Sequence, residues 1–340
     1  MKVLLTGHNG YIGSVLTPML KAHGHEVVGL DTNYFKRCLF VGELTEVPGF
    51  DTDVRTLDGV ELEGFDAVIH LAGLSNDPLG DYRPTLTEEI NQQASVALAK
   101  RAKAAGVPRF LFASSCSNYG AAGADFLDEQ ASFNPVTPYG VSKVNVEKAL
   151  NQLADDSFSP TYLRASTAYG VSPLLRFDLV INNLTAWAIT TGRVFIKSDG
   201  TPWRPMVHVE DIACAYIAVL EAQRSVVHNQ AFNVGVTTEN YQVRELADIV
   251  QDIVPGCKVE YAPDAGPDPR CYRVDCNKIA RTLHGFKPQW TVERGIEQLY
   301  QAYRDVGLTL EEFEGERYKR IAHIKHLVED GLLDDHLHWR

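Results

Sequence analysis

A tyrosine and a lysine, Tyr139 and Lys143, form the pair of side chains in this sequence best suited to acid/base chemistry. They are four residues apart and follow Pro138, a favoured first residue of a helix, so both would lie on one helical face. A phenol with a pKa of about 10 is a poor base at neutral pH, but a nearby ammonium favours the phenolate. The pattern therefore predicts a general acid/base at Tyr139 supported by Lys143, with a surface Tyr–Lys pair as the alternative.

Hydroxyl and thiol groups follow the apolar segment 109–114, which we expect to be a strand. In an open parallel sheet, ligands bind beyond the carboxyl ends of the strands, so this run would face a ligand. Ser115 could then share a proton path with Tyr139 and a substrate oxygen, and Ser117 could bind the substrate. Cys116 is a second acid/base candidate because a thiol has a pKa of about 8.5; the alternative is a small buried residue at a strand end.

Three glycines, Gly7, Gly10 and Gly13, lie between the first apolar segment, 3–6, and the first helical pattern, 14–23. Gly7 permits a tight turn, Gly10 lets the backbone approach a pyrophosphate, and Gly13 lets the helix pack against the sheet. The helix N-terminus then offers N–H groups and the positive end of its dipole to an anion. This spacing predicts a dinucleotide site, and the residues expected to contact the cofactor are Gly7, Asn9, Gly10, Tyr11, Ile12 and Gly13.

Asp31 ends the next expected strand, 27–31, and stands 18 residues after Gly13. A carboxylate at this point can accept hydrogen bonds from both ribose hydroxyls of NAD and would repel the 2′-phosphate of NADP. A turn aspartate is the alternative, since Asp is common at strand ends, and Arg37 nearby could soften the preference. We expect NAD as the cofactor.

The first half of the chain alternates short apolar runs with longer helical patterns. The expected strands are 3–6, 27–31, 67–71, 109–114 and 161–165, and the expected helices are 14–23, 85–105 and 138–153. Strands separated by helices of about ten or more residues imply βαβ units with parallel strands. The fold class is therefore α/β, with a Rossmann-type doubly wound parallel sheet and a smaller, discontinuous C-terminal substrate lobe.

The pattern is less regular beyond residue 170. We expect helices at 178–191, 209–223, 243–253 and 292–305, short strands at 194–196, 231–234 and 259–261, and one or two peripheral helices in the charged tail 308–340. The expected organisation is an NAD-binding Rossmann domain at 1–170, with returning segments near 205–235. Residues 171–340 would form mainly the substrate-binding lobe and C-terminal helices.

The composition is that of an ordinary globular protein: of 340 residues, 45% are hydrophobic and 22% charged, and the formal net charge is -12. The negative charge argues against a nucleic-acid surface, although a few arginines can still hold an anionic ligand locally. The N-terminus lacks a signal-peptide pattern and no run of about 18 apolar residues exists, so we expect no membrane insertion. Six scattered cysteines, without zinc-like spacing at Cys271 and Cys276, indicate reduced thiols, a cytoplasmic protein and no metal site.

Taken together, these motifs resemble the extended short-chain dehydrogenase/reductase family. The resemblance rests on the glycine turn, Asp31, the segments 53–55, 70–73 and 114–120, the Tyr139–Lys143 pair, and the segments 163–164 and 169–170, which occur in the family's order from residue 1 to about 290. The resemblance implies a Rossmann fold, NAD and, as for most members, a nucleotide-sugar substrate. It also implies a homodimer formed through the helices 85–105 and 138–153.

The same resemblance gives roles to further residues. The residues that it places at the cofactor are Asp53 and Val54 at the adenine, Leu71, Ala72 and Gly73 along the dinucleotide, and Tyr139 and Lys143 at the nicotinamide. It makes Tyr139 the acid/base, with Ser115 beside it. Two positions depart from the family: Thr167 stands where Asn is usual, and Gly73 ends a motif that usually ends in Ala. These changes leave the details of the nicotinamide pocket open.

In the second half, Arg204 and Arg270 stand in the segments 200–211 and 268–275, which look like the family's diphosphate-binding segments. A guanidinium can chelate phosphate oxygens with its planar fork, and a surface ion pair is the alternative for each. Asn183 is a further substrate-binding candidate, with a helix-capping or surface asparagine as the alternative. The expected partner is a sugar linked to UDP, dTDP, GDP or CDP.

Departures from the family pattern narrow the expected reaction. The family's 4,6-dehydratases carry an acidic pair where this chain has Cys116 and Ser117, and its decarboxylating members carry Glu at the second of these positions. The favoured hypothesis is therefore an NAD-dependent nucleotide-sugar epimerase that acts through a transient keto-sugar, most often at C4. If Cys116 served as an acid/base, epimerisation at C3 or C5 would be an alternative.

Other functions remain open at this point. Within the family, the alternatives are a nucleotide-sugar ketoreductase or dehydrogenase and a 4,6-dehydratase. A non-sugar oxidoreductase is less favoured, because a neutral substrate needs no diphosphate clamp of the kind that Arg204 and Arg270 would form. A nonenzymatic NAD-binding module would have no use for Tyr139 and Lys143.

Overall fold

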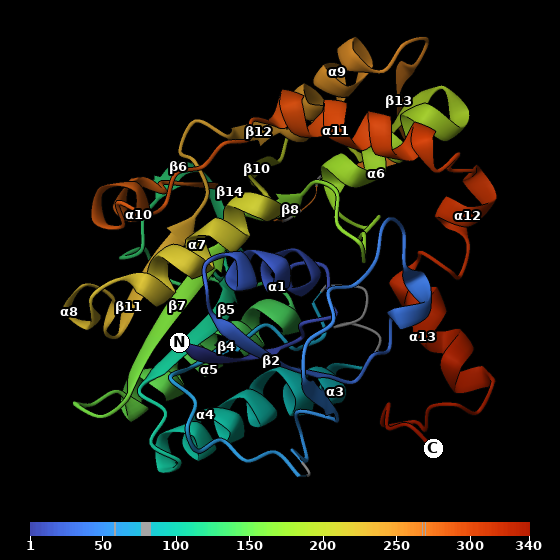
Figure 1. The fold of residues 1–340 in the computed structure, drawn as a ribbon. Coiled ribbons are helices and arrows are strands. Elements are labelled where there is room, and N and C mark those ends of the chain that lie inside the picture. The colour runs from blue at the N-terminus through green and yellow to red at the C-terminus, as the bar shows by residue number, and fades with distance from the viewer. Residues whose placement is uncertain (58, 76–82, 267, 269) are drawn as a thin grey trace.

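The computed structural model describes residues 1–57, 59–75, 83–266, 268 and 270–340. Its central element is a parallel sheet of seven strands. In spatial order the strands are β11 (Gln230–Val234), β7 (Ser159–Ala165), β5 (Arg109–Ser115), β4 (Ala67–His70), β1 (Lys2–Thr6), β2 (Glu26–Asp31) and β3 (Gly49–Asp51). The chain begins at β1 inside the sheet and extends from there toward both edges (Figure 1), which confirms the predicted doubly wound α/β fold.

Strand β1 shows why these segments form the centre of the sheet. Val3 and Leu5 point to one face and Leu4 to the other, and all three are fully buried. A strand that is apolar on both faces needs cover on both faces, as in parallel sheets generally. Helices α1 (Gly13–Ala22) and α7 (Val209–Glu221) cover the face of Val3, and α4 (Ala94–Ala104) and α5 (Pro138–Leu153) cover the face of Leu4.

The single helix expected at 85–105 is wrong in detail, because the structure divides it. The chain forms α3 (Pro84–Thr87), a π-helical turn over Glu88–Gln93, and then α4. Within the π turn, the buried Asn91 side chain donates to Leu74 O at 2.9 Å and accepts from Leu74 N at 2.7 Å. These bonds hold the loop that follows β4, and π turns often occur where a helix meets a functional site.

The second half of the chain builds most of three small sheets beside the large one. They pair β8 (Thr167–Tyr169) and β12 (Asn240–Gln242) with β10 (Trp203–His208), β9 (Arg193–Ser198) with β13 (Lys258–Gly266), and β6 (Ala121–Leu127) with β14 (Cys271–Val274). Helices α6 (Val180–Thr191), α9 (Val243–Ile253) and α11 (Val292–Asp305) pack together over this region, and two short helices, α8 (Arg224–Val227) and α10 (Asn277–Thr282), lie near β11. The expected strands 194–196 and 259–261 are the centres of β9 and β13.

The C-terminal tail returns to the first half of the molecule. It forms two helices, α12 (Leu310–Glu314) and α13 (Arg320–Glu329), as the sequence predicted. The tail is less peripheral than expected, because Ile324, Leu327, Leu333 and Leu337 are buried in the same hydrophobic cluster as Leu4 of β1. Figure 1 shows α13 and the C-terminus beside the blue segment that follows β2. Within the described ranges, none of the helices is long and apolar enough to cross a membrane.

Candidate active site

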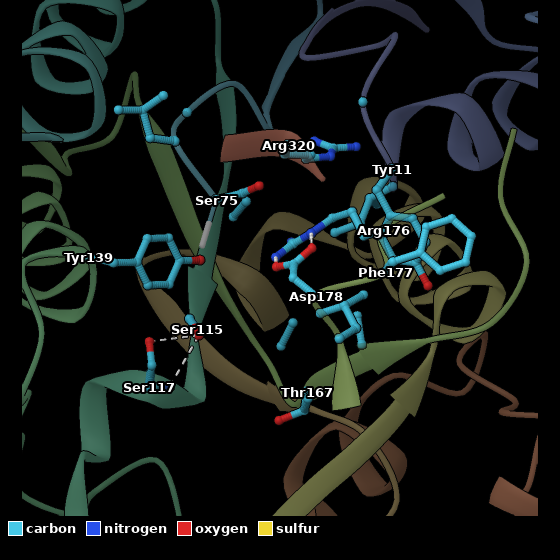
Figure 2. Close-up of a pocket in the computed structure, with 18 of the residues that line it drawn as sticks. Tyr11, Ser75, Ser115, Ser117, Tyr139, Thr167, Arg176, Phe177, Asp178 and Arg320 are labelled. Atoms are coloured by element: carbon cyan, nitrogen blue, oxygen red, sulfur yellow. Dashed lines mark hydrogen bonds and ion pairs between the residues drawn. The ribbon is translucent and has the colours of Figure 1, made fainter. Parts of the chain in front are cut away.

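A cavity of about 920 Å³ lies between the carboxyl ends of the central strands and the second half of the chain (Figure 2). Its volume is near the upper end of the range of about 300–1,000 Å³ for small-molecule sites. Every residue that the sequence predicted for cofactor or substrate binding lines this cavity, from the glycine turn to Asn183, Arg204 and Arg270. The structure therefore brings these residues together, and their individual roles stay predictions.

The glycine turn is built so tightly that it needs its glycines. Gly7 has a φ of +75, and a Cβ there would lie 2.8 Å from the backbone N of Ala72. A Cβ on Gly13 would lie 2.1 Å from Gly7 O. No side chain of the described residues caps the start of α1, and Gly10, Tyr11, Ile12 and Gly13 at this end of the helix line the cavity. This arrangement fits a dinucleotide pyrophosphate.

Asp31 lies at the end of β2 on the same side of the cavity. Its carboxylate accepts hydrogen bonds from Asn9 N at 3.0 Å and from Asn33 N at 2.8 Å, which fixes its orientation. Burial raises the pKa of Asp31, and these two N–H groups partly oppose that rise. Asp53, the residue predicted at the adenine, is held by an ion pair with Arg55 at 2.6 Å.

Tyr139 and Lys143 stand in the first turns of α5, where the sequence placed them. Thr137 caps this helix by accepting from Gly140 N at 3.2 Å. The Lys143 side chain is buried, with Nζ 5.4 Å from the centre of the Tyr139 ring and 4.8 Å from that of Phe112. Burial lowers the pKa of Lys143 to about 8, although the carboxylate of Glu147 opposes this shift.

The two serines at the end of β5 meet in the cavity below Tyr139 (Figure 2). Ser115 Oγ accepts from Ser117 Oγ at 2.9 Å and from Ser117 N at 3.1 Å. The second bond caps the 3₁₀ turn Cys116–Tyr119 that follows the strand. The turn thus fixes the Ser115 hydroxyl close to the phenol, as the predicted proton path requires.

Unlike Ser115 and Ser117, Cys116 does not line the cavity. Its side chain is fully buried, Sγ lies 3.1 Å from Arg164 O as a donor, and the residue is outside the lining of the cavity. Burial raises the pKa of the Cys116 thiol to about 12, which removes it further from acid/base work at neutral pH. The geometry corrects the acid/base hypothesis for Cys116 and matches its alternative, a small buried residue at a strand end.

Arg204 and Arg270 meet at one carboxylate, that of Asp268, in the lining of the cavity. The Nη2 atoms of both donate to Asp268 Oδ2, at 2.8 Å from Arg204 and 2.6 Å from Arg270. Arg204 is buried in β10 and also donates to Arg270 O, so its pair is not a surface ion pair. Burial raises the pKa of Asp268. The hydrogen bonds from Arg270 and the charge of Arg204 outweigh this effect, so the pKa of Asp268 is lowered. A diphosphate could take the place of this carboxylate between the two guanidinium groups.

Asn183 is a weaker candidate than the arginines. It lines the cavity from α6, but its Nδ2 donates to Phe177 O at 2.9 Å, a contact that ties the start of the helix to the preceding loop. Asn183 thus lines the cavity without capping α6, and its role in substrate binding stays a prediction.

Arg176, Asp178 and Arg320 are among the charged residues of the cavity that sequence reasoning missed. Arg176 and Asp178 form an ion pair at 2.6 Å opposite the phenol of Tyr139 (Figure 2). Their place in the loop after Tyr169 was a usable signal, since that loop leaves the strand end at which the cavity opens. Arg320 belongs to the tail, and nothing in its local sequence indicates the cavity.

The comparisons with known proteins agree with this geometry. The chain matches the NAD dependent epimerase/dehydratase family over residues 3–235. A UDP-glucose 4-epimerase of Neisseria meningitidis serogroup B is 30% identical over 333 residues, covering 88% of this chain and 95% of that protein. The Thermus thermophilus UDP-glucose 4-epimerase, solved with NAD, is 26% identical with a TM-score of 0.75, covering 89% of this chain and 99% of that one. MoeE5, solved with UDP-glucose and NAD, is 25% identical with a TM-score of 0.76, covering 91% of this chain and 100% of that one.

The chain therefore belongs to the NAD dependent epimerase/dehydratase family. It is an enzyme of that family, and its cofactor is NAD. The resemblance to extended short-chain dehydrogenases and the choice of NAD over NADP, both predicted from the sequence, are confirmed. NAD fits the glycine turn and Asp31, and it supplies a hydride acceptor and donor when it is bound.

Replacing Gly7 with alanine should remove most of the bound NAD. The Cβ would enter the backbone of Ala72, so the turn must move out of the position that receives the pyrophosphate. Strain of this kind is worth about 1–3 kcal/mol, or roughly a 10- to 100-fold loss of affinity. The measurement is the NAD content of the purified protein, determined chromatographically after denaturation.

Gly24→Ala is the matched control, because Gly24 has a similar φ of +78 but open space where its Cβ would be. This variant should be about 1–2 kcal/mol less stable and should keep its NAD. Equal NAD loss in both folded variants would contradict the steric role of Gly7.

Turnover should decline as the pH rises through about 8. Because burial lowers the pKa of Lys143 to about 8, its ammonium is present below that pH and is lost above it. Loss of the charge removes the support for the Tyr139 phenolate. The measurement is kcat/KM across pH 6–10 at saturating NAD, an interval of about 2 units on either side of that pKa.

Lys143→Arg serves as the control for the decline near pH 8, since a guanidinium stays charged over the whole pH interval. The variant should lose the decline near pH 8 even if its turnover is lower throughout. A decline at the same pH in this variant would show that the loss of turnover comes from the titration of another group.

Proposed function

We propose that this enzyme is a nucleotide-sugar epimerase that inverts the configuration at C4 of the sugar through a transient keto-sugar. One observation carries the proposal: a single cavity is lined by Tyr139, Lys143 and Ser115 and also by Arg204 and Arg270. The first set suits proton transfer at a sugar hydroxyl, and the second suits a diphosphate. The two epimerases and the UDP-glucose complex named above support the same substrate class.

Binding begins at the arginines. The diphosphate of the substrate displaces Asp268 from the forks of Arg204 and Arg270, which exchanges one anion for another in a partly buried site. The sugar then extends toward Tyr139. The carboxylate of Asp178, held by Arg176 at 2.6 Å, can accept a hydrogen bond from a sugar hydroxyl on the way.

The chemistry that these residues perform is the movement of one proton. Tyr139 takes the proton of the reacting sugar hydroxyl, while the Ser115 hydroxyl holds the same oxygen. Bound NAD would accept a hydride from the sugar carbon, which yields a ketone, and would return it to the other face of the ketosugar. Tyr139 then gives the proton back. Substrate and product differ only in configuration, so no net oxidation occurs.

The structure also bears on the alternatives from the same family. A 4,6-dehydratase of the usual pattern needs acidic side chains at positions 116 and 117, and this chain has a buried thiol and a serine there. A ketoreductase would use the same Tyr139, Lys143 and Ser115, and it differs from an epimerase in consuming reduced cofactor. It is therefore the second candidate.

The homodimer stays part of this proposal, with α4 and α5 as the interface. Val141 on α5 is 42% exposed, and Ala97 and Ala104 on α4 are exposed small side chains. Small residues on neighbouring helices allow the close approach of two further helices from a second copy.

The proposed reaction is tested with a set of UDP- and dTDP-hexoses. We expect interconversion of the C4 epimers by the purified protein, without net NADH formation or consumption. Tyr139→Phe should lower kcat by roughly 10²- to 10⁴-fold, because the acid/base is gone, and should keep its bound NAD. Consumption of NADH in proportion to product would instead indicate a ketoreductase, and a 4-keto-6-deoxy product would indicate a dehydratase.

Arg204 is tested separately by binding. UDP should raise the Tm of the wild-type protein, and Arg204→Ala should bind UDP roughly 10- to 100-fold more weakly, since charge-assisted hydrogen bonds are lost. Arg193→Ala is the matched control, because Arg193 forms an exposed pair with Glu260 at 3.5 Å, away from the cavity. Equal UDP protection of both variants would refute the diphosphate role of Arg204.

A further inference from the structure

Arg320 reaches the cavity from the C-terminal tail. It is the first residue of α13, it is 8% exposed, and it lies on the same side of the cavity as Tyr11 and Arg176 (Figure 2). Its guanidinium thus comes from the end of the chain to a site that the beginning of the chain builds.

The charge of Arg320 is poorly compensated by the protein. Nη2 donates to Leu174 O at 3.1 Å, and the guanidinium stands 4.3 Å from the centre of the Phe35 ring. Across the described ranges, no carboxylate lies within 4.0 Å of it. Burial lowers the pKa of Arg320 to about 10, and the charge of Arg176 adds to this shift, so the group is still a cation at neutral pH. A buried cation without a carboxylate is costly unless an anion joins it.

The neighbours of Arg320 indicate which anion this is. Burial raises the pKa of both Tyr11 and Asp31, and the charge of Arg320 is among the effects that oppose the rise at each. Arg320 also lines the same cavity as the glycine turn and Asp31, so a ligand that spans those two would share the cavity with the Arg320 guanidinium. In a bound dinucleotide, the group between these two points is the pyrophosphate. A planar guanidinium is well suited to chelate it.

The tail around Arg320 is fastened to the segments that form the adenosine side of the site. We call residues 315–340 the C-terminal strap. Its contacts lie directly after Asp31 and around Asp53. They are His323 Nε2 donating to Tyr34 O at 3.0 Å, Tyr34 Oη donating to Leu337 O, Trp339 Nε1 donating to Thr32 O at 2.6 Å, and Arg55 Nη1 donating to His336 O at 2.7 Å.

We propose that Arg320 binds the pyrophosphate of NAD and that the C-terminal strap positions it there. The side chain lines the cavity on the side of the glycine turn, so the N-terminus of α1 and the Arg320 guanidinium would both contact the pyrophosphate. Release of NAD then requires this guanidinium to give up its anion. The inference rests on the NAD site and not on the proposed epimerisation, so each can fail without the other.

The experiment compares Arg320→Met, Arg320→Lys and Arg317→Met. Arg317 is the matched control, because it lies in the same strap, is half exposed and pairs with Glu312 at 3.4 Å. Binding of NAD, ADP-ribose and adenosine is measured by calorimetry on protein freed of cofactor, and the release of NAD is followed by exchange with a fluorescent NAD analogue.

We expect Arg320→Met to bind NAD and ADP-ribose roughly 10- to 100-fold more weakly and to release NAD faster, with adenosine binding unchanged. Arg320→Lys should recover part of the loss, and Arg317→Met should behave as wild type. The Tm of the cofactor-free Arg320→Met protein should not fall, since the substitution removes an uncompensated buried cation, whereas the increase in Tm caused by NAD should shrink.

Three outcomes would overturn the proposal. Equal weakening of adenosine and NAD, or a lower Tm of the cofactor-free protein, would show that Arg320 only supports the fold. A selective loss of NADP binding would show that Arg320 contacts the ribose 2′ position and not the pyrophosphate. Unchanged NAD release together with a raised KM for the nucleotide sugar would show that Arg320 binds the substrate.

Discussion

The buried ammonium of Lys143 is the interaction on which the catalytic half of the site depends. A charge in an apolar environment is costly, and here the rings of Phe112 and Tyr139 and the carboxylate of Glu147 reduce that cost. Glu147 is in turn bound by Arg164 of β7 at 2.7 Å, with both side chains almost fully buried. This series of contacts fixes α5 over the ends of β5 and β7, and the position of Tyr139 follows from it.

The buried arginines of the cavity fall into two groups, which explains how a protein with a net charge of -12 can hold anionic ligands. Arg176 and Arg204 each have a carboxylate partner, Asp178 and Asp268 respectively. A ligand that binds them must displace or share that partner, which suits a substrate that arrives and leaves in every cycle. Arg320 has no carboxylate within ion-pair distance among the described residues, and such a group gains most from an anion that stays.

The sequence predicted those parts of the site that local spacing determines. The glycine turn and the Tyr139–Lys143 pair depend on a few consecutive residues of one strand and one helix, so their geometry follows from the pattern. The position of Cys116 could also have been inferred: if Ser115 and Ser117 both face the cavity, the residue between them faces the core. Arg320 could not be found in this way, since its place depends on the packing of a tail that lies 289 residues after Asp31. The pairing of β6 with β14 escaped prediction for the same reason.

The proposed reaction makes opposite demands on one cavity. The sugar must be free to present both of its faces, while the cofactor must stay until it has returned the hydride. In the proposed arrangement, different parts of the chain meet these two demands. The glycine turn, which fits against the backbone of Ala72, and the strap, which is hydrogen-bonded to Thr32 and Arg55, would hold the cofactor. The paired charges of Arg204 and Asp268 would exchange partners with the substrate. A Tyr139 that only removes and returns one proton needs no second acid, which fits a site in which position 116 has turned into the core.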